Sequence, residues 1–185
     1  MEDYRQIVKF LSALDKKIEK KTKLYLIGGS TITLTLDRKN RTEDIDVVDV
    51  EKKITDLAGK DSELAKKFNV YIHKMYEIDF SAPKDWRDIA KPIDGLSLNN
   101  LDLRAADVHD VVLGKFARLH PKDFEDITAL NKNGHINIDF LLKRLNQNTK
   151  ELMNLEYKNN VKLAFELIFG NKIIFRQGQA LLSKK

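Results

Sequence analysis

Two acidic residues on either side of one aliphatic residue are the part of this sequence that most directly suggests chemistry. Asp44 and Asp46 flank Ile45, and the alternation of acidic and aliphatic residues continues to Val50. A period of two is typical of a half-buried strand, in which residues i and i+2 point to the same face. The sequence therefore predicts two carboxylates that project together, about 7 Å apart at their Cα atoms.

Such a pair of carboxylates favours a bound cation. The two negative charges repel each other unless a positive charge lies between them, and Mg²⁺ or Mn²⁺ accepts oxygen ligands. A cation held in this way can activate an attacking oxygen and stabilise a leaving pyrophosphate. An exposed edge strand with polar alternation is the alternative interpretation of Asp44 and Asp46 when they are taken alone.

A glycine pair lies shortly before these carboxylates. The apolar run Leu24–Ile27 predicts a buried strand, and Gly28, Gly29 and Ser30 follow it. Ser30 stands where the N-cap of a helix is expected, although residues 31–36 have a strand-like composition. Glycines let the backbone approach a phosphate closely, and the N–H groups at the start of a helix favour anions. The turn matches neither the G-x-x-x-x-G-K-[ST] nor the G-x-G-x-x-G phosphate-binding pattern.

Taken together, the apolar strand, the Gly-Gly-Ser turn and the Asp-x-Asp strand about 14 residues later resemble the nucleotidyltransferase superfamily, which has the polymerase-beta-like fold. The segment Arg41–Val47 is similar to a motif of the AbiEii-like and DUF6036-like families of that superfamily. Lys115, the segment Lys122–Ile127 and the stretch Ser81–Ile93 also resemble patterns of these families. The resemblance covers about residues 24–130.

The resemblance implies a Mg²⁺-dependent enzyme and a role for each matching residue. Asp44 and Asp46 would be catalytic metal ligands, and a third carboxylate on a neighbouring strand would complete the set. Asp79 fits that catalytic and metal-binding position best, and Asp102, in the same local pattern, stays open as the alternative. Lys115 would be catalytic and would contact phosphate. The residues implied to bind the nucleotide are Gly28, Gly29, Ser30, Arg41, Lys115, Lys122, Asp123 and Asp126.

The elements that must position these residues can be predicted from hydrophobic periodicity. Apolar residues at helical spacing predict amphipathic helices over residues 3–20 and 54–68. Residues 70–80 look extended, and a further strand is expected near Leu96–Leu103. From Asp107 onward only helices are expected, with Gly134 and Gly170 as stops.

These elements predict an α/β (α+β) fold. A nucleotidyltransferase-type mixed sheet with flanking helices would occupy residues 1–104, and a C-terminal helical bundle would occupy residues 105–185.

Composition removes several classes of function. The chain has 185 residues and 0 Cys, which excludes disulfides, thiol catalysis and Cys-based metal sites. Its four histidines, His73, His109, His120 and His135, are far apart and show no zinc-enzyme signature, so each is expected to be an ordinary surface or core residue.

No apolar run approaches the roughly 20 residues of a membrane span, and the N-terminus lacks an apolar signal segment. We therefore expect a cytoplasmic protein without membrane contacts.

The positive charge is concentrated near the C-terminus. Residues 141–185 carry 9 basic and 3 acidic side chains, although the formal net charge of the whole chain is only +5. A local basic excess can attract a polyanion such as RNA, whereas a solvated Lys-rich surface is the plainer interpretation. We expect these basic residues, Lys143, Arg144 and Lys150 among them, to form part of an acceptor-binding surface.

Three functional hypotheses follow. The first is an enzyme that uses an NTP as substrate and transfers its nucleoside monophosphate to RNA, a protein or a small molecule. Its resemblance to toxin components implies a toxin–antitoxin or phage-defence role, with an antitoxin as a partner. The second is a catalytically incomplete binding or regulatory module on the same fold. The third is a glycosyltransferase that binds a sugar nucleotide through Asp-x-Asp, and the short chain argues against it.

Overall fold

The structure is a computed structural model that describes residues 2–36 and 42–183. The chain forms two compact units, each of which is described by itself. The first comprises Met1–Phe80 and Arg87–Ala106, and the second comprises Ser81–Trp86 and Asp107–Lys185. The assignment of separate domains to residues 1–104 and 105–185 stays a prediction. Within the described residues, no helix is both long enough and apolar enough to cross a membrane.

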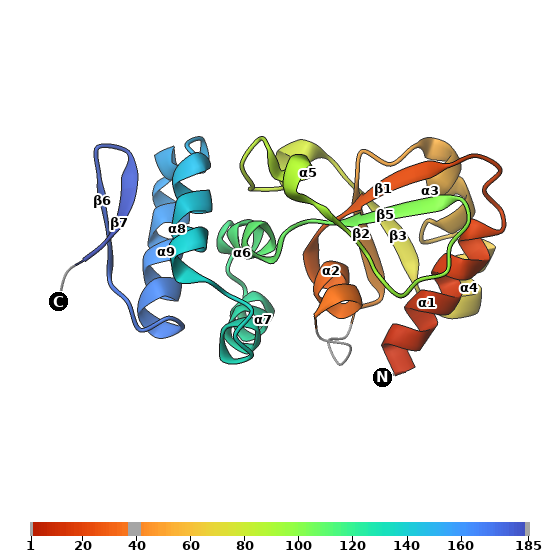
Figure 1. Ribbon diagram of the computed structural model, residues 1–185, viewed down its shortest axis with the longest axis horizontal. Coiled ribbons are helices and arrows are strands. Elements are labelled where there is room, and N and C mark those ends of the chain that lie inside the picture. The colour runs from red at the N-terminus through yellow and green to blue at the C-terminus, as the bar shows by residue number, and fades with distance from the viewer. Residues whose placement is uncertain (1, 37–41, 184–185) are drawn as a thin grey trace. The chain divides into compact units, whose positions relative to one another are not determined.

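A five-stranded mixed sheet is the centre of the first unit (Figure 1). Strand β1 is parallel to β5 and antiparallel to β2, while β2 is parallel to β3 and β4 is antiparallel to β5. Strand β2 is an interior strand, so its residues lie between two hydrogen-bonded neighbours. In spatial order the strands are β3 (Tyr71–Met75), β2 (Asp44–Val48), β1 (Thr22–Leu26), β5 (Leu101–Ala105) and β4 (Lys91–Pro92).

Helices complete the first unit. Helices α1 (Glu2–Asp15), α3 (Lys52–Ala58) and α4 (Glu63–Phe68) lie together on one side of the sheet, and α2 (Gly28–Thr35) packs against β2 (Figure 1). A 3₁₀ helix, η1 (Glu77–Asp79), follows β3, and the short helix α5 begins at Trp86 and ends at Ile89. The mixed sheet with flanking helices confirms the predicted fold class.

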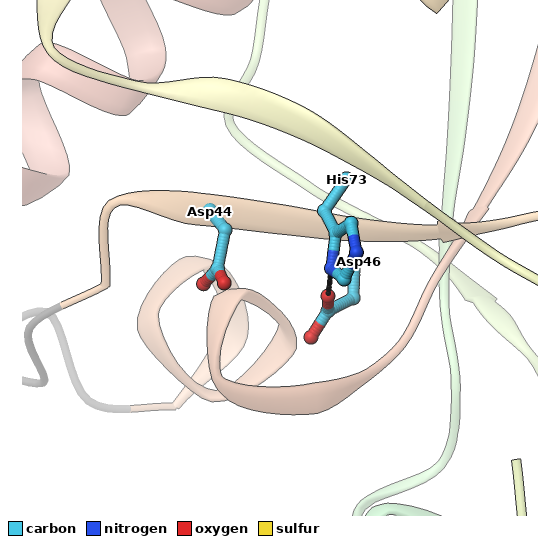
Figure 2. A group of neighbouring side chains, drawn as sticks. All are labelled: Asp44, Asp46 and His73. Carbon is cyan, nitrogen blue, oxygen red and sulfur yellow. Dashed lines mark hydrogen bonds and ion pairs between the residues drawn. The ribbon is translucent and has the colours of Figure 1, made fainter. Parts of the chain in front are cut away.

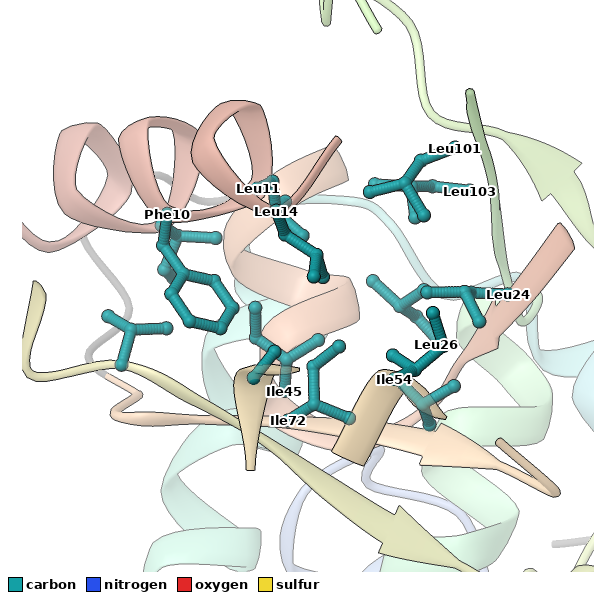
Figure 3. Close-up of a cluster of buried hydrophobic side chains, with 14 of the residues drawn as sticks. Phe10, Leu11, Leu14, Leu24, Leu26, Ile45, Ile54, Ile72, Leu101 and Leu103 are labelled. Carbon is teal, nitrogen blue, oxygen red and sulfur yellow. The ribbon is translucent and has the colours of Figure 1, made fainter. Parts of the chain in front are cut away.

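The core of the first unit forms where α1 faces the sheet. Phe10 and Leu14 are 0% exposed, and Figure 3 shows their side chains directed toward aliphatic side chains of the strands. Ile45 and Ile72 lie opposite each other on β2 and β3 and point into this core. Burial of each large aliphatic side chain contributes roughly 1.5 to 3 kcal/mol. The apolar residues of β2 are thus firmly oriented, and their acidic neighbours must point the other way.

The second unit contains helices α6 (Val108–Phe116), α7 (Pro121–Lys132), α8 (Ile138–Gln147) and α9 (Leu155–Leu167), with a 3₁₀ helix, η2 (Glu151–Met153). Helix α6 packs against α7, α8 and α9. Phe116 of α6 contacts the rings of Tyr157 and Phe165 of α9, and burial raises the pKa of the Tyr157 hydroxyl. Trp86 is 1% exposed and therefore packs in the interior.

Two predictions about elements were wrong. The single helix expected over residues 54–68 is two helices, because the chain leaves α3 at Gly59 in an extended conformation and Ser62 begins α4 by accepting a hydrogen bond from the Ala65 N–H. The C-terminal region, which was expected to contain only helices, ends in a hairpin. Its strands are β6 (Ile173–Arg176) and β7 (Gln179–Leu182). Its turn is formed by Gln177 and Gly178, both at positive φ, and such a turn suits a two-residue hairpin.

Candidate metal and nucleotide site

The two carboxylates of β2 lie on one face of the sheet. Ile45 and Val47 are 0% exposed in the core, so the alternation directs Asp44 and Asp46 to the opposite face. Figure 2 shows both carboxylates on the same side of β2. Because β2 is paired with β1 and with β3, the exposed edge strand proposed as an alternative is wrong.

Thr42 holds the carboxylate of Asp44. Its hydroxyl lies 2.9 Å from Asp44 Oδ1 and 3.0 Å from the Asp44 carbonyl oxygen, both of which can accept its proton. The threonine stands two residues before the strand, where Ser and Thr commonly form local side-chain hydrogen bonds. This positioning role was not predicted from the sequence, although the threonine belongs to the motif quoted above.

The glycine turn lies directly against Asp46. Gly28 has φ +69°, and a Cβ atom added there would lie 2.4 Å from Asp46 Oδ2. The Ile27 N–H donates to the Asp46 carbonyl oxygen at 3.0 Å. Helix α2 begins at Gly28, so its first turn starts beside this carboxylate. The structure thus brings the glycine turn and the acidic strand together.

Ser30 does not cap this helix. The N-cap residue is Ile27, and the Ser30 hydroxyl donates back to the Ile27 carbonyl oxygen at 3.2 Å. Ser30 is only 1% exposed, so its hydroxyl faces the interior. The prediction of an N-cap at Ser30 was wrong because the helix begins two residues earlier, at Gly28, so Ser30 lies inside its first turn.

A histidine that the sequence did not single out joins the two carboxylates. His73 lies on β3 directly opposite Asp46, and its Nδ1 is 3.0 Å from Asp46 Oδ1 (Figure 2). One ligand atom from each of Asp44, Asp46 and His73 lies within 4.8 Å of the others. The alternation of Tyr71, buried Ile72 and His73 could have indicated the face of His73 but not its partner strand.

The electrostatic potential at this end of β2 and β3 is negative. Tyr71 is paired with Asp44 across the sheet. Burial and the charges of Asp44, Asp46 and Glu43 raise the pKa of the Tyr71 hydroxyl. A local concentration of negative charge of this kind attracts cations.

The expected third carboxylate is not in this group. Asp79 belongs to η1 rather than to a strand, and its carboxylate accepts the Tyr76 N–H at 3.3 Å. Asp102 does lie on a strand, β5, where Arg104 donates to it at 2.9 and 3.2 Å. Among the described residues, the group of ligand atoms within 4.8 Å contains neither of them. The placement of Asp79 on a strand was wrong because the chain turns after Met75.

The remaining predicted residues are Arg41 and four residues of the second unit. Arg41 lies outside the described residues. In the second unit, Lys115 Nζ is 3.0 Å from Asp123 Oδ1 and 2.6 Å from Asp126 Oδ2. Arg118 also donates to Asp123. Lys122 stands one position before Asp123 and is exposed.

Asp123 is the centre of this second cluster. It is 2% exposed, and burial alone would raise the pKa of its carboxyl, but hydrogen bonds and positive charge from Arg118 and Lys115 bring that pKa below its ordinary value. Asp123 is therefore held as a carboxylate. The cluster balances the charges of Lys115 and Arg118 with those of Asp123 and Asp126, so Lys115 already has two carboxylate partners.

Two solved structures are similar to this chain, and one family model matches it. The crystal structure of JHP933 from Helicobacter pylori has a TM-score of 0.45 and 16% identity, over 87% of this chain and 79% of that one. A candidate nucleotidyltransferase from H. pylori has a TM-score of 0.44 and 17% identity, over 86% and 81%. No curated protein matches the chain. The family model described as a nucleotidyltransferase of unknown function, DUF6036, matches residues 2–170, and the chain therefore belongs to that family.

Proposed function

We propose that this chain is a divalent-cation-dependent nucleotidyltransferase. The reaction would join a hydroxyl oxygen of an acceptor to the α-phosphorus of an NTP and release pyrophosphate and a proton. The observation that carries the proposal is the close approach of the Gly28 backbone to Asp46, which shares one face of β2 with Asp44. Family membership supports the same conclusion.

The donor set fits a divalent cation. Two carboxylates and an imidazole offer ligand atoms within 4.8 Å of one another, a span that metal–ligand bonds of about 2.0 to 2.6 Å can bridge. Asp44, Asp46 and His73 would hold the ion, and Thr42 would keep the Asp44 carboxylate in place. A bound cation would supply charge neutralisation at the phosphates and at the leaving pyrophosphate.

The turn at Gly28 and Gly29 would receive the triphosphate. The start of a helix favours negative charge through the helix dipole. Ser30 would contribute its backbone N–H rather than its hydroxyl, which donates to Ile27. Contacts of Lys115 and Lys122 with phosphate rest on the resemblance alone. Both lysines belong to the second unit, in which Lys115 donates to Asp123 and Asp126.

Transfer can be tested directly with α-labelled NTPs. We would incubate the full chain with each of the four NTPs, Mg²⁺ or Mn²⁺, and either total RNA or total protein as acceptor. We expect label transfer that falls by on the order of 10³ or more in Asp44→Asn and in Asp46→Asn, because charge stabilisation in the transition state is lost. Asp61→Asn, an exposed position outside the site, is the matched control and should retain full activity. Unchanged transfer in either site variant would refute the proposal.

A catalytically incomplete binding module is the second candidate. It is favoured by the position of Asp79 and Asp102 outside the group formed by Asp44, Asp46 and His73. The same experiment separates the two functions, because an incomplete site would bind an NTP without transferring label to any acceptor.

We propose a toxin–antitoxin or phage-defence role on the resemblance alone. Expression of the chain should then arrest growth, and Asp46→Asn should relieve the arrest. If the wild type and Asp46→Asn arrested growth equally, the toxicity would not depend on nucleotidyl transfer.

A further inference from the structure

The histidine beside the two carboxylates changes the chemistry of the metal site. Residues on adjacent strands that are paired in register present their side chains to the same face. The register of β2 and β3 therefore places His73 on the face that carries Asp44 and Asp46. Its side chain is 52% exposed and that of Asp46 is 23% exposed, so an ion can reach both from solvent.

We infer that His73 is the third ligand of this metal site and that its imidazole makes the site prefer a divalent transition-metal ion over Mg²⁺. The inference deepens the proposed function and rests on it, because transfer is what the bound ion would serve. Mg²⁺ binds mainly oxygen ligands and keeps several waters, whereas imidazole nitrogen suits transition-metal ions. A set of two carboxylates and one imidazole can therefore bind Mn²⁺ through all three groups.

The competing explanation is that His73 only orients Asp46. A histidine can hold a ligating carboxylate through a hydrogen bond without touching the ion, and the 3.0 Å contact between Nδ1 and Oδ1 is of that kind. Two features favour direct ligation: the exposure of the ring and the 4.8 Å span of the whole group. The two explanations differ in whether nitrogen contacts the ion.

Pulsed electron paramagnetic resonance of Mn²⁺ bound to the full chain, without nucleotide, tests this difference. We expect the wild-type protein to show modulation from a directly bound ¹⁴N nucleus. His73→Gln should lose that modulation and bind Mn²⁺ about 10-fold or more weakly, on the scale of lost metal-site partners. His135→Gln, a histidine of the second unit between α7 and α8, is the matched control and should change neither quantity.

A third variant tests the preference between ions. His73→Asp would supply three carboxylates, so Mg²⁺ should displace Mn²⁺ at about 10-fold lower concentration than in the wild-type protein. Circular dichroism would check that each variant is folded. Wild-type protein without ¹⁴N modulation, or His73→Gln with the modulation unchanged, would overturn the inference. Weaker Mn²⁺ binding in His73→Gln without a nitrogen signal in the wild type would assign His73 to positioning and would also overturn it.

The proposed function can fail separately. Because the measurement contains no nucleotide, a chain that binds Mn²⁺ through nitrogen but transfers no label would refute the transferase and keep the ligand assignment. A chain that transfers label without a nitrogen signal would refute only the ligand assignment. Absence of any Mn²⁺ binding would overturn both the third ligand and the preference.

Discussion

At the scale of single residues, one glycine decides how closely the backbone approaches a carboxylate. Gly28 combines a positive φ with the absence of a side chain, and both are needed at its position. The left-handed conformation costs a residue with a Cβ roughly 1 to 2 kcal/mol, while the contact with Asp46 Oδ2 leaves no room for a methyl group. The cost of the positive φ and the cost of the contact with Asp46 can be separated experimentally, because Gly95 has a positive φ without such a contact.

Gly28→Ala should weaken metal binding by about 10-fold or more, because the new methyl group must displace the Asp46 carboxylate. Gly95→Ala is the matched control: Gly95 has φ +79° and no atom within 4 Å of an added Cβ. Both variants should lose about 1 kcal/mol of unfolding free energy in urea from backbone strain, and Gly28→Ala should lose more because of its contact with Asp46. A Mn²⁺ titration of both proteins checks the prediction, and equal affinities would contradict it.

At the scale of elements, a buried carboxylate ties the end of α1 to the start of β5. Asp15 is 3% exposed and accepts the backbone N–H groups of Asn99, Asn100 and Leu101 at 2.7 to 2.8 Å. Burial by itself would raise the pKa of this carboxyl, but the three donors, together with Lys21, lower that pKa below its ordinary value. The carboxylate therefore stabilises the junction only while it is ionised.

Asp15→Asn should destabilise the protein by about 2 to 4 kcal/mol at pH 7, because an amide cannot satisfy all three donors. A lowered folded-state pKa means that the stabilisation is complete above the unfolded-state pKa, near 3.9, and is lost as pH falls through the folded-state pKa. The difference in unfolding free energy between wild type and variant should therefore shrink below about pH 4. Urea unfolding at several pH values tests this.

The matched control for Asp15→Asn is Asp56→Asn, at an exposed position of α3. Its stability should stay within about 0.5 kcal/mol of the wild type. A difference between wild type and Asp15→Asn that remains constant as the pH falls would show that ionisation of Asp15 does not stabilise the fold.

At the scale of the whole molecule, the basic side chains of the C-terminal region differ in their exposure to solvent. Arg144 is 2% exposed, and its guanidinium donates to Asp110, Asp85 and Gln147. Burial alone would lower the pKa of Arg144, but Asp110 and Asp85 raise it. Asp85 comes from the segment Ser81–Trp86, which belongs to the second unit. Arg144 therefore stabilises that unit, and its expected place on an acceptor surface was wrong.

The exposed lysines remain the basis of the expected acceptor-binding surface, and the following test applies if the acceptor is RNA. Three or four phosphate contacts should give a slope of log affinity against log salt near -3, since each adds about 0.7 to 0.9. Lys143→Glu with Lys150→Glu should weaken RNA binding and reduce that slope, while NTP binding is unchanged. The control with equal charge change is Lys60→Glu with Lys66→Glu, at exposed positions of the first unit. Filter binding at several salt concentrations measures the slope, and RNA binding that does not depend on salt would exclude this surface.

Local sequence was enough to predict the parts of the site that depend on neighbouring residues. The alternation around Asp44 and Asp46 determines their common face, because successive side chains of a strand point to opposite sides. The glycine pair predicted a turn after β1, because glycine adopts positive φ at little cost. The general order of strands and helices followed from periodicity in the same way.

Tertiary structure alone decided which distant residues meet. His73 faces Asp46, 27 residues away, through the register of β3 on β2, and no local pattern contains that register. Asp79 and Arg144 carried the right charge for their predicted roles, but a 3₁₀ turn and a buried ion pair placed them elsewhere. Local preferences fix backbone conformation within a few residues, whereas strand pairing and burial are decided by the free energy of packing segments that are distant in the sequence.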